Sequence, residues 1–386
     1  MITVNSFLTR RENTNYQINM ILLLRRMIIK ADHYRVLGIM SGTSLDGVDL
    51  ACCSFAKNDS SWKFEITDAV TVGYSNEWFE RLSTLHSQDG LTLAITHVEY
   101  GRFLGDLAAK FIREKKLKVD FISSHGHTIF HQPVKKLTLQ IGEGAALSAS
   151  GGLPVVCDFR SQDVALGGQG APLVPIGDEL LFSEFDFCLN LGGIANISFK
   201  VSENRFAFDV VPCNLVLNDL AGKLNKKYDD EGLLGASGKV NDSLLNQLND
   251  FEYYQKKIPK SLGREDVEKL YFPLLSSQRI SVEDKLATFC EHIAFQISKV
   301  IEEQKLLSPS ESKLLITGGG ALNKFLVKRI EDLSSVHIII PDRKIIEFKE
   351  ALIFAFLGVL RWRNEINTLK SVTGATSDHS AGAIYL

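Results

Sequence analysis

"GIMSGTSLDGVD", residues 38–49, joins the apolar runs "YRVL" (34–37) and "LACCSF" (50–55). The two runs predict strands, and Asp46-Gly47 is typical of the turn between them. Three glycines, three hydroxyl side chains and two aspartates are more polar groups than a turn needs. Glycine lets the backbone approach a ligand, hydroxyl and N–H groups donate to phosphate oxygens, and aspartate can hold Mg²⁺ or its waters. We therefore predict a phosphate-binding hairpin, with an ordinary Asp-Gly turn as the simpler alternative.

Two other well-known loops do not fit this hairpin. The Walker order GxxxxGK[ST] is missing, and a strand rather than a helix follows the segment. The G-x-S-x-G elbow of the α/β-hydrolases is also missing there. The hairpin therefore needs another interpretation.

Length and composition limit the classes of protein. The chain has 386 residues, more than one hydrophobic core usually supports, so we expect two domains. Hydrophobic residues make up 45% and charged residues 23%, as in ordinary globular proteins. A formal net charge of -3 without a basic, aromatic patch argues against nucleic acid as a partner. No apolar run approaches the roughly 18–20 residues of a membrane span, so no membrane partner is expected.

Cysteine usage and the N-terminus indicate the cellular setting. The six cysteines form no CxxC pair and most lie in apolar runs, which favours a reducing, cytoplasmic location. The stretch "NMILLLRRMIIK" has an apolar core too short for an export signal. We expect residues 1–32 to be a disordered extension or a mis-assigned start, with Met20 or Met27 as the native start.

Strand and helix patterns alternate along the chain and predict an α/β fold. Residues 34–40, 47–55 and 63–72 predict an antiparallel meander, and residues 99–116 predict an amphipathic helix. Strand, glycine turn and strand recur at residues 185–201, roughly 150 residues after the first hairpin. This repetition predicts one domain over residues 33–185 and another over 186–386, with a C-terminal segment that can pack back on the first.

Two further glycine turns follow strands in the second half. Gly192 and Gly193 lie between the strands of "NLGGIANIS", while "LLITGGGALNKFL" places Gly318, Gly319 and Gly320 between a strand and a helix. A glycine turn that opens a helix brings backbone N–H groups toward a nucleotide. Each turn alone is a weak signal. Three of them spread over both halves predict a nucleotide held between two domains.

"VVCDFRSQD" places Asp158 at the end of an apolar strand, with Arg160 two residues later. A carboxylate at the end of a buried strand is expected either to be paired with a cation or hydrogen-bond donor, or to have a functional role. Asp158 is therefore a candidate general base. The alternative is an aspartate satisfied by Arg160 or by N–H groups of the turn.

Two other polar segments carry weaker signals. "HGHTIFH" supplies His125, His127 and His131, but no acidic or cysteine ligand stands at a usual zinc spacing. We expect these histidines to contact a ligand or to be ordinary turn residues. In "IPKSLGRED", Lys260 and Arg264 form a basic loop whose simplest interpretation is a solvated surface.

Nine segments, taken in order, resemble the anhydro-N-acetylmuramic acid kinase family. They span Gly38 to Asp378, nearly everything after the N-terminal extension. The segments are "GIMSGTSLDGVD", "HGHTIFHQP", "TLQIGEG", "VVCDFRSQDVALGGQGAPLVP", "LNLGGIANIS", "PKSLGRE", "TGGGALN", "KEALIFAFL" and "VTGATSD".

The resemblance implies a two-domain, actin-like ATPase fold built from ribonuclease H-like units, with a central ATP cleft. It implies an ATP-dependent kinase that acts on 1,6-anhydro-N-acetylmuramic acid released in peptidoglycan turnover. Such an enzyme opens the anhydro bridge with water and phosphorylates O6. The products are N-acetylmuramic acid 6-phosphate and ADP.

The resemblance also implies particular site residues. Asp158 matches the family's catalytic aspartate. The ATP-binding stretch corresponds to Gly42, Thr43, Ser44, Leu45, Asp46, Gly47, Val48 and Asp49. Mg²⁺ would neutralise the phosphates, with Asp46, Asp49 and Glu350 as candidate ligands. The expected partners are the anhydro amino sugar and ATP, and a homodimer is left open.

The chain departs from the family pattern at two places. Family members usually have Phe-Asp-Thr-Gly-Pro-Gly-Asn where this chain has "FDVVPCN", residues 208–214, and His127 stands where they have glutamine. Val211 and Cys213 cannot adopt a positive φ as readily as glycine, so the backbone there must differ or be strained. Two alternatives follow: a related kinase for another anhydro or amino sugar, and a non-catalytic, nucleotide-dependent sensor of muropeptide sugars.

Overall fold

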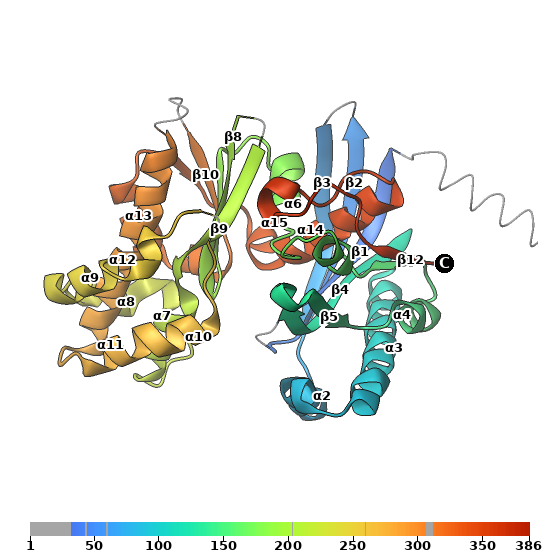
Figure 1. The fold of residues 1–386 in the computed structure, drawn as a ribbon, viewed down its shortest axis with the longest axis horizontal. Helices are drawn as coiled ribbons and strands as arrows, with labels where there is room; N and C mark the ends of the chain where they lie inside the picture. The colour runs from blue at the N-terminus through green and yellow to red at the C-terminus, as the bar shows by residue number, and fades with distance from the viewer. Residues whose placement is uncertain (1–31, 43–44, 59–60, 203, 259, 306–311) are drawn as a thin grey trace, which may run out of the picture.

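The computed structural model describes residues 32–386, except residues 43–44, 59–60, 203, 259 and 306–311 (Figure 1). Two mixed β-sheets with helices around them make up the described part of the chain, which confirms the predicted α/β class. Apart from Asp32, the predicted N-terminal extension lies outside the described residues.

The first sheet has the order β12-β6-β4-β1-β2-β3, with β5 paired to β4. Its first three strands form the predicted antiparallel meander, and β4 and β6 extend it in parallel from β1. The strands are β1 (His33–Ser41), β2 (Val48–Asn58), β3 (Ser61–Val72), β4 (Phe121–Gln132), β5 (Leu137–Ile141), β6 (Val155–Cys157) and β12 (Ala383–Tyr385).

The second sheet repeats this plan with the order β11-β10-β7-β8-β9. A three-strand antiparallel meander is again followed by two parallel strands. The strands are β7 (Phe187–Leu191), β8 (Ile194–Val201), β9 (Asn204–Pro212), β10 (Lys313–Thr317) and β11 (His337–Ile339). The same order and directions in both sheets are those of a ribonuclease H-like unit that occurs twice, as the actin-like ATPase fold requires.

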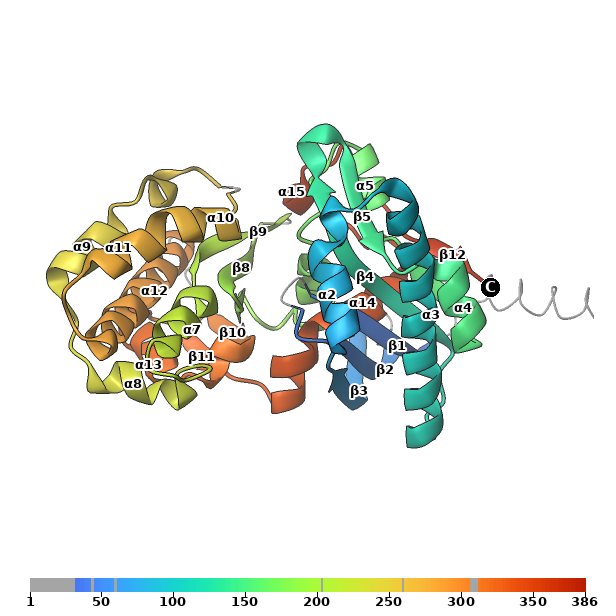
Figure 2. The ribbon, with the colours of Figure 1, turned by 90° about the horizontal axis from the view of Figure 1, so that it is seen from below.

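Helices cover the outer faces of both sheets (Figures 1 and 2). The first sheet is accompanied by α2 (Asn76–Thr84), α3 (Gly90–Lys115), α4 (Gly144–Gly151), α5 (Ser161–Ala165) and α6 (Pro175–Leu181). The second is accompanied by α7 (Asn214–Gly222), α8 (Leu233–Ser237), α9 (Asp242–Asn249), α10 (Arg264–Asp266), α11 (Phe272–Ser277), α12 (Val282–Lys305) and α13 (Lys324–Leu333). The C-terminal part adds α14 (Arg343–Trp362) and α15 (Lys370–Thr373).

Helix α14 lies between the two sheets. It contacts β1, β2 and β4 of the first sheet and β10 of the second. Its apolar residues share one buried cluster with Val36 of β1, Cys188 of β7 and Leu315 of β10. A helix that is apolar nearly all round is suited to such a position, because both of its sides are buried. The C-terminal part of the chain therefore packs against the sheet formed by the N-terminal part, and β12 pairs with β6 in the same way.

Gly38 in β1 allows α14 to approach the sheet backbone. A Cβ atom at this position would lie 2.1 Å from the carbonyl oxygen of Ala351, which no L-side chain tolerates without movement of the helix. We expect Gly38→Ala to lower the free energy of unfolding by about 1–3 kcal/mol, the usual cost of overpacking.

Urea denaturation followed by circular dichroism would measure this loss. Gly90→Ala, at the first residue of α3, is the matched control because nothing lies within 4 Å of its added Cβ. Alanine favours the helix there, so this control should be neutral or slightly stabilising. Equal unfolding midpoints for the two variants would show that α14 does not rest on β1 at Gly38.

Candidate active site

The hairpin between β1 and β2 holds the predicted phosphate-binding residues in an unusual backbone. Thr43 and Ser44 lie outside the described residues. Leu45 has a φ of 59°, a region that branched side chains rarely occupy, and its N–H donates to the carbonyl oxygen of Gly42 at 3.3 Å. Gly47 has a φ of 153°, and its Cβ would lie 2.4 Å from the carbonyl oxygen of Val72 in β3. Strain of this kind is common at ligand-binding loops.

A buried cluster of hydroxyl groups supports the base of the hairpin. The Oγ atom of Ser41, the last residue of β1, lies 2.6 Å from the Tyr74 hydroxyl and 2.8 Å from His127 Nδ1. The Tyr100 hydroxyl donates to the same Oγ atom at 2.9 Å. Four distant segments therefore meet next to Gly42. Local sequence patterns do not predict this cluster, because its members are 26 to 86 residues apart along the chain.

The predicted metal-binding carboxylates share one electrostatic environment. Burial raises the pKa of Asp49, and the Asp46 carboxylate adds to this effect, although a 2.6 Å hydrogen bond from Thr71 opposes it. Burial also raises the pKa of Glu350 on α14, where Asp49 acts in the same direction and Arg160 opposes it. The Glu350 side chain remains exposed to solvent. The protein groups around it therefore displace part of its hydration shell without enclosing the carboxylate.

This set of carboxylates suits a hard cation such as Mg²⁺, which takes oxygen ligands. Among the residues that the structure describes, no three His, Cys, Asp or Glu side chains already form a metal cluster. A Mg²⁺ ion held here would therefore take its other ligands from phosphate oxygens and water, as Mg²⁺ commonly does.

Asp158 stands just after β6 with its side chain exposed and with a φ of 58°. The Ser161 hydroxyl donates to its Oδ1 atom at 2.5 Å. Arg160 bonds elsewhere, so the alternative in which Arg160 satisfies Asp158 is wrong. Asp158 and Glu143 both act to raise the pKa of His97 in α3, although burial lowers that pKa overall.

Arg160 donates from Nε to His125 Nε2 at 2.9 Å. A second donor on Arg160 reaches the carbonyl oxygen of Gly170 at 2.6 Å. A bulge in β4, with Gly126 at a φ of 75°, separates the directions of His125 and His127. His125 packs against Phe354 in α14, 4.6 Å between ring centres.

The three histidines of "HGHTIFH" thus have separate surroundings. His125 and His127 are buried and bonded within the protein, whereas His131 is exposed and lies 3.2 Å from the Thr138 hydroxyl. They form no common site.

The glycine turns of the second half come together at one end of the second sheet. The carbonyl oxygen of Gly192 accepts from the N–H of Asn214, and the Asn214 side chain donates to the carbonyl oxygen of Leu191 at 2.8 Å. Gly318 has a φ of 79°, and its Cβ would lie 2.4 Å from Asn190 Oδ1. The other glycines of this group are Gly193, which is exposed, Gly319, also exposed, and Gly320, which packs on Leu191.

Helix α14 borders both groups. It carries Glu350, and it also contacts the short helix η6 (Gly319–Leu322) beside the second group. The first sheet therefore carries Asp46 and Asp49 at the β1–β2 hairpin, the second sheet carries the other two glycine turns, and the helix that bears Glu350 contacts both sheets.

Val211 and Cys213, in the altered loop at residues 208–214, both keep negative φ values. Cys213 has φ −129° and ψ −104°, outside the main allowed regions, which fits the strained backbone that was one of the two expectations. The Asp209 carboxylate accepts from the N–H of Leu262 at 3.0 Å and is thereby engaged. The solvated-surface interpretation fits exposed Arg264 but not half-buried Lys260, whose Nζ lies 4.7 Å from the ring centre of Tyr253.

His127 should make stability depend on pH in a defined window. Burial lowers the pKa of folded His127 to about 4, whereas a histidine in the unfolded chain titrates near its usual value of about 6.5. Between these values the unfolded chain binds more protons, so stability attributable to this site falls as the pH drops from about 6.5 to about 4.

We expect His127→Gln to remove this dependence. The unfolding free energy of the natural protein minus that of the variant should fall by up to about 3 kcal/mol as the pH drops from about 6.5 to about 4. Urea titrations at several pH values measure the difference, in which the groups common to both proteins cancel. Parallel stability profiles would show that His127 takes up its proton in the folded protein as readily as in the unfolded chain.

Comparison with known proteins shows the family of the chain. The family model described as "Anhydro-N-acetylmuramic acid kinase" matches residues 34–386. A protein of that name from Caldanaerobacter subterraneus subsp. tengcongensis is 33% identical, with 91% of this chain and 96% of the relative aligned. Another from Sulfurimonas denitrificans is 34% identical, with 90% and 98% aligned.

One solved structure shows how far the likeness extends beyond these relatives. It is the activator of the 2-hydroxyisocaproyl-CoA dehydratase from Clostridium difficile with bound ADPNP, at 12% identity and a TM-score of 0.42. The match covers 85% of this chain and 96% of that one, and it is too distant to bear on function. The family match over nearly the whole described chain is decisive, and this protein belongs to the anhydro-N-acetylmuramic acid kinase family.

Proposed function

We propose that this protein is an ATP-dependent kinase of peptidoglycan recycling. It opens 1,6-anhydro-N-acetylmuramic acid with water and phosphorylates the sugar at O6, which gives N-acetylmuramic acid 6-phosphate and ADP. The observation that carries the proposal is an exposed Asp158 that follows β6, in the same sheet as the β1–β2 hairpin, in a chain of this family.

Asp158 is suited to the role of general base. Its carboxylate is exposed and accepts one hydrogen bond from a neutral serine hydroxyl, so its remaining lone pairs are free to take a proton. In the reaction, Asp158 removes a proton from the attacking water as the water oxygen bonds to the anomeric carbon. The bond from that carbon to O6 breaks, and O6 attacks the γ-phosphorus of ATP, which releases ADP.

ATP would lie between the two predicted domains, residues 33–185 and 186–386. The hairpin of residues 42–49 would hold phosphates from the first domain, and Gly192, Gly193 and Gly318–Gly320 would approach the nucleotide from the second. Asp46, Asp49 and Glu350 would hold Mg²⁺, which neutralises phosphate charge. The pKa of Glu350 is raised by burial and further by the Asp49 carboxylate, and the pKa of Asp49 is raised by burial and further by Asp46. This supports the assignment, because a cation relieves such repulsion.

The cellular setting that fits is the cytoplasm. All six cysteines are buried and free, as expected under reducing conditions. None of the helices that the structure describes is long and apolar enough to span a membrane. A homodimer is compatible with this assignment.

Isotope labelling tests the reaction directly. The purified protein is mixed with ATP, Mg²⁺ and anhydro-N-acetylmuramic acid in ¹⁸O-labelled water. We expect one ¹⁸O atom at the anomeric carbon of a 6-phosphorylated product. ATP binding without any sugar product would favour the muropeptide sensor, and turnover of only another anhydro or amino sugar would favour the related kinase suggested by the loop at residues 208–214.

The role of Asp158 has its own test. Asp158→Asn keeps the size of the side chain but removes the base, so kcat should fall by about 10²–10⁴-fold. Nucleotide affinity, measured by calorimetry with ADP, should stay within a factor of about three, because the substitution leaves the phosphate hairpin intact.

Asp106→Asn is the matched control, since Asp106 is exposed on α3, away from the hairpin and from β6. It should leave both quantities at wild-type values. A kcat for Asp158→Asn equal to that of the control would move the general base to another residue.

A further inference from the structure

The hydrogen bonds of Arg160 go to neutral acceptors rather than to a carboxylate. His125 Nδ1 lies 2.9 Å from the carbonyl oxygen of Gly126, which can only accept, so Nδ1 carries the proton. His125 Nε2 is then a neutral acceptor for Arg160, and the second acceptor is the neutral carbonyl oxygen of Gly170. Among the described residues no carboxylate forms an ion pair with Arg160. Only two of the five N–H donors of the guanidinium are used in this way.

The position of Arg160 indicates that its charge serves to bind an anionic group. The guanidinium carbon of Arg160 lies 5.9 Å from the ring centre of Phe354, one helical turn after Glu350 on α14. The Glu350 and Asp163 carboxylates both act to raise the pKa of Arg160, and Arg160 opposes the raised pKa of Glu350. Burial lowers the pKa of Arg160 to about 10, which leaves it charged at neutral pH. Asp158 is two residues away in sequence. A planar, partly buried guanidinium with unused donors recognises phosphate or carboxylate groups well.

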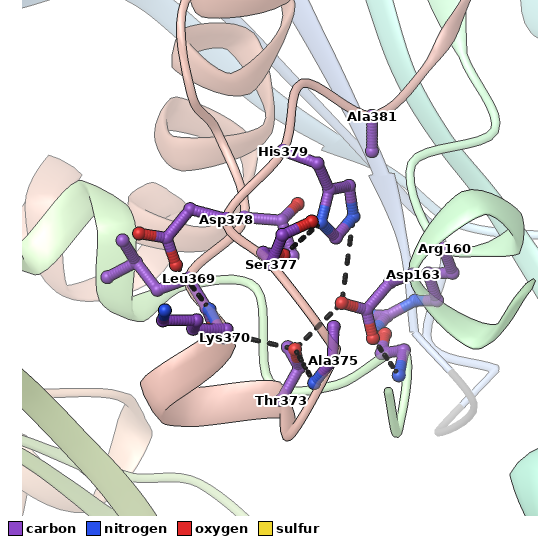
Figure 3. A network of polar contacts seen from close by, with 12 residues as sticks. Arg160, Asp163, Leu369, Lys370, Thr373, Ala375, Ser377, Asp378, His379 and Ala381 are labelled. Carbon is purple, nitrogen blue, oxygen red and sulfur yellow. Dashed lines mark hydrogen bonds and ion pairs between the residues drawn. The ribbon is translucent and has the colours of Figure 1, made fainter. Parts of the chain in front are cut away.

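Asp163 organises the loop that holds Arg160 (Figure 3). Its carboxylate is fully buried and accepts from the N–H of Gly170 at 2.6 Å and from the Thr373 hydroxyl at 2.7 Å. His379 Nε2 lies 3.6 Å from the same carboxylate. The loop follows this group closely, since a Cβ on Gly168 would lie 2.2 Å from Asp163 Oδ2.

The C-terminal segment fixes the same loop from outside. The carbonyl oxygen of Thr373 accepts from the N–H of Gln169 at 2.8 Å, and the N–H of Thr376 donates to Leu166 at 3.1 Å. Gly170 links this network to Arg160: its N–H donates to Asp163, and its carbonyl oxygen accepts from Arg160. The network therefore sets the direction of the guanidinium.

We propose that Arg160 is a further binding residue of the active site, which contacts an anionic group of a substrate, and that Asp163 is its positioning residue. The inference rests on the proposed function, whose substrates supply two such anions: the γ-phosphoryl group of ATP and the carboxylate of the sugar's lactyl ether. Both offer the same chemistry to a guanidinium.

Paired ligands distinguish the two sources. Calorimetry compares a non-hydrolysable ATP analogue with ADP, and anhydro-N-acetylmuramic acid with 1,6-anhydro-N-acetylglucosamine, which lacks the lactyl group. A contact to the γ-phosphoryl group predicts that Arg160→Gln weakens only the ATP analogue, by about 10–100-fold. A contact to the lactyl carboxylate predicts the same loss only for anhydro-N-acetylmuramic acid. Arg160→Lys should recover part of the affinity, because it restores the charge but not the planar fork.

Arg102→Gln, on the exposed face of α3, is the control and should bind all four ligands normally. Asp163→Asn tests positioning: it should weaken the same ligand as Arg160→Gln, and the double variant should bind it no worse than Arg160→Gln alone. Losses that add in the double variant would show that Asp163 acts on stability instead.

The inference is overturned if Arg160→Gln remains folded, shown by normal ADP binding, and also binds the other three ligands as the natural protein does. This outcome is separate from a failure of the proposed function. In that case the natural protein would not turn over the sugar, while the comparison of the ATP analogue with ADP would still show whether Arg160 binds a phosphoryl group.

Discussion

The burial of α14 between two sheets is the constraint on which the rest of the structure depends. Lys349 on this helix lies 2.8 Å from Asp178 in α6, and both side chains are buried. Asp178 also accepts from Ser198 of β8 at 2.5 Å, and Ser198 accepts from Arg205 of β9 at 2.9 Å. Separating the ion pair would leave charges without partners inside the protein, which costs about 3–5 kcal/mol. The network therefore ties α14 to the second sheet while Gly38 lets it touch the first.

The position of α14 determines the geometry of the candidate site. Glu350 follows Lys349 directly, so the ion pair that fixes α14 also fixes a carboxylate at the candidate metal site. Phe354, one turn later on α14, packs against the His125 ring. The carbonyl oxygen of Phe354 accepts from the hydroxyl of Ser123 in β4 at 2.5 Å. A residue near the end of the chain thus sets the surroundings of a strand near its beginning, which explains why the C-terminal segments belong to the site.

Local patterns in the sequence predicted the parts of the fold that depend on neighbours along the chain. The meander, the glycine turns and the apolar character of α14 follow from periodicity and turn chemistry. Contacts between distant segments could not be predicted in this way. Ser41 contacts Tyr74, Tyr100 and His127 only when the separate segments that carry these residues have packed together. An alternative to Asp158 as general base was that Arg160, close to it in sequence, satisfies it, but Arg160 bonds to His125 and to the carbonyl oxygen of Gly170 instead.

The different bonding partners of Asp158 and Arg160 have a chemical consequence. His125 and Gly170 hold the guanidinium, whereas the hydrogen bond that the Asp158 carboxylate accepts from the described residues comes from the neutral Ser161 hydroxyl. Asp158 and Arg160 therefore do not occupy one another. The loop presents a carboxylate that can accept a proton together with a guanidinium that has unused N–H donors, and hydrolysis coupled to phosphoryl transfer needs both a proton acceptor and a group that binds an anion.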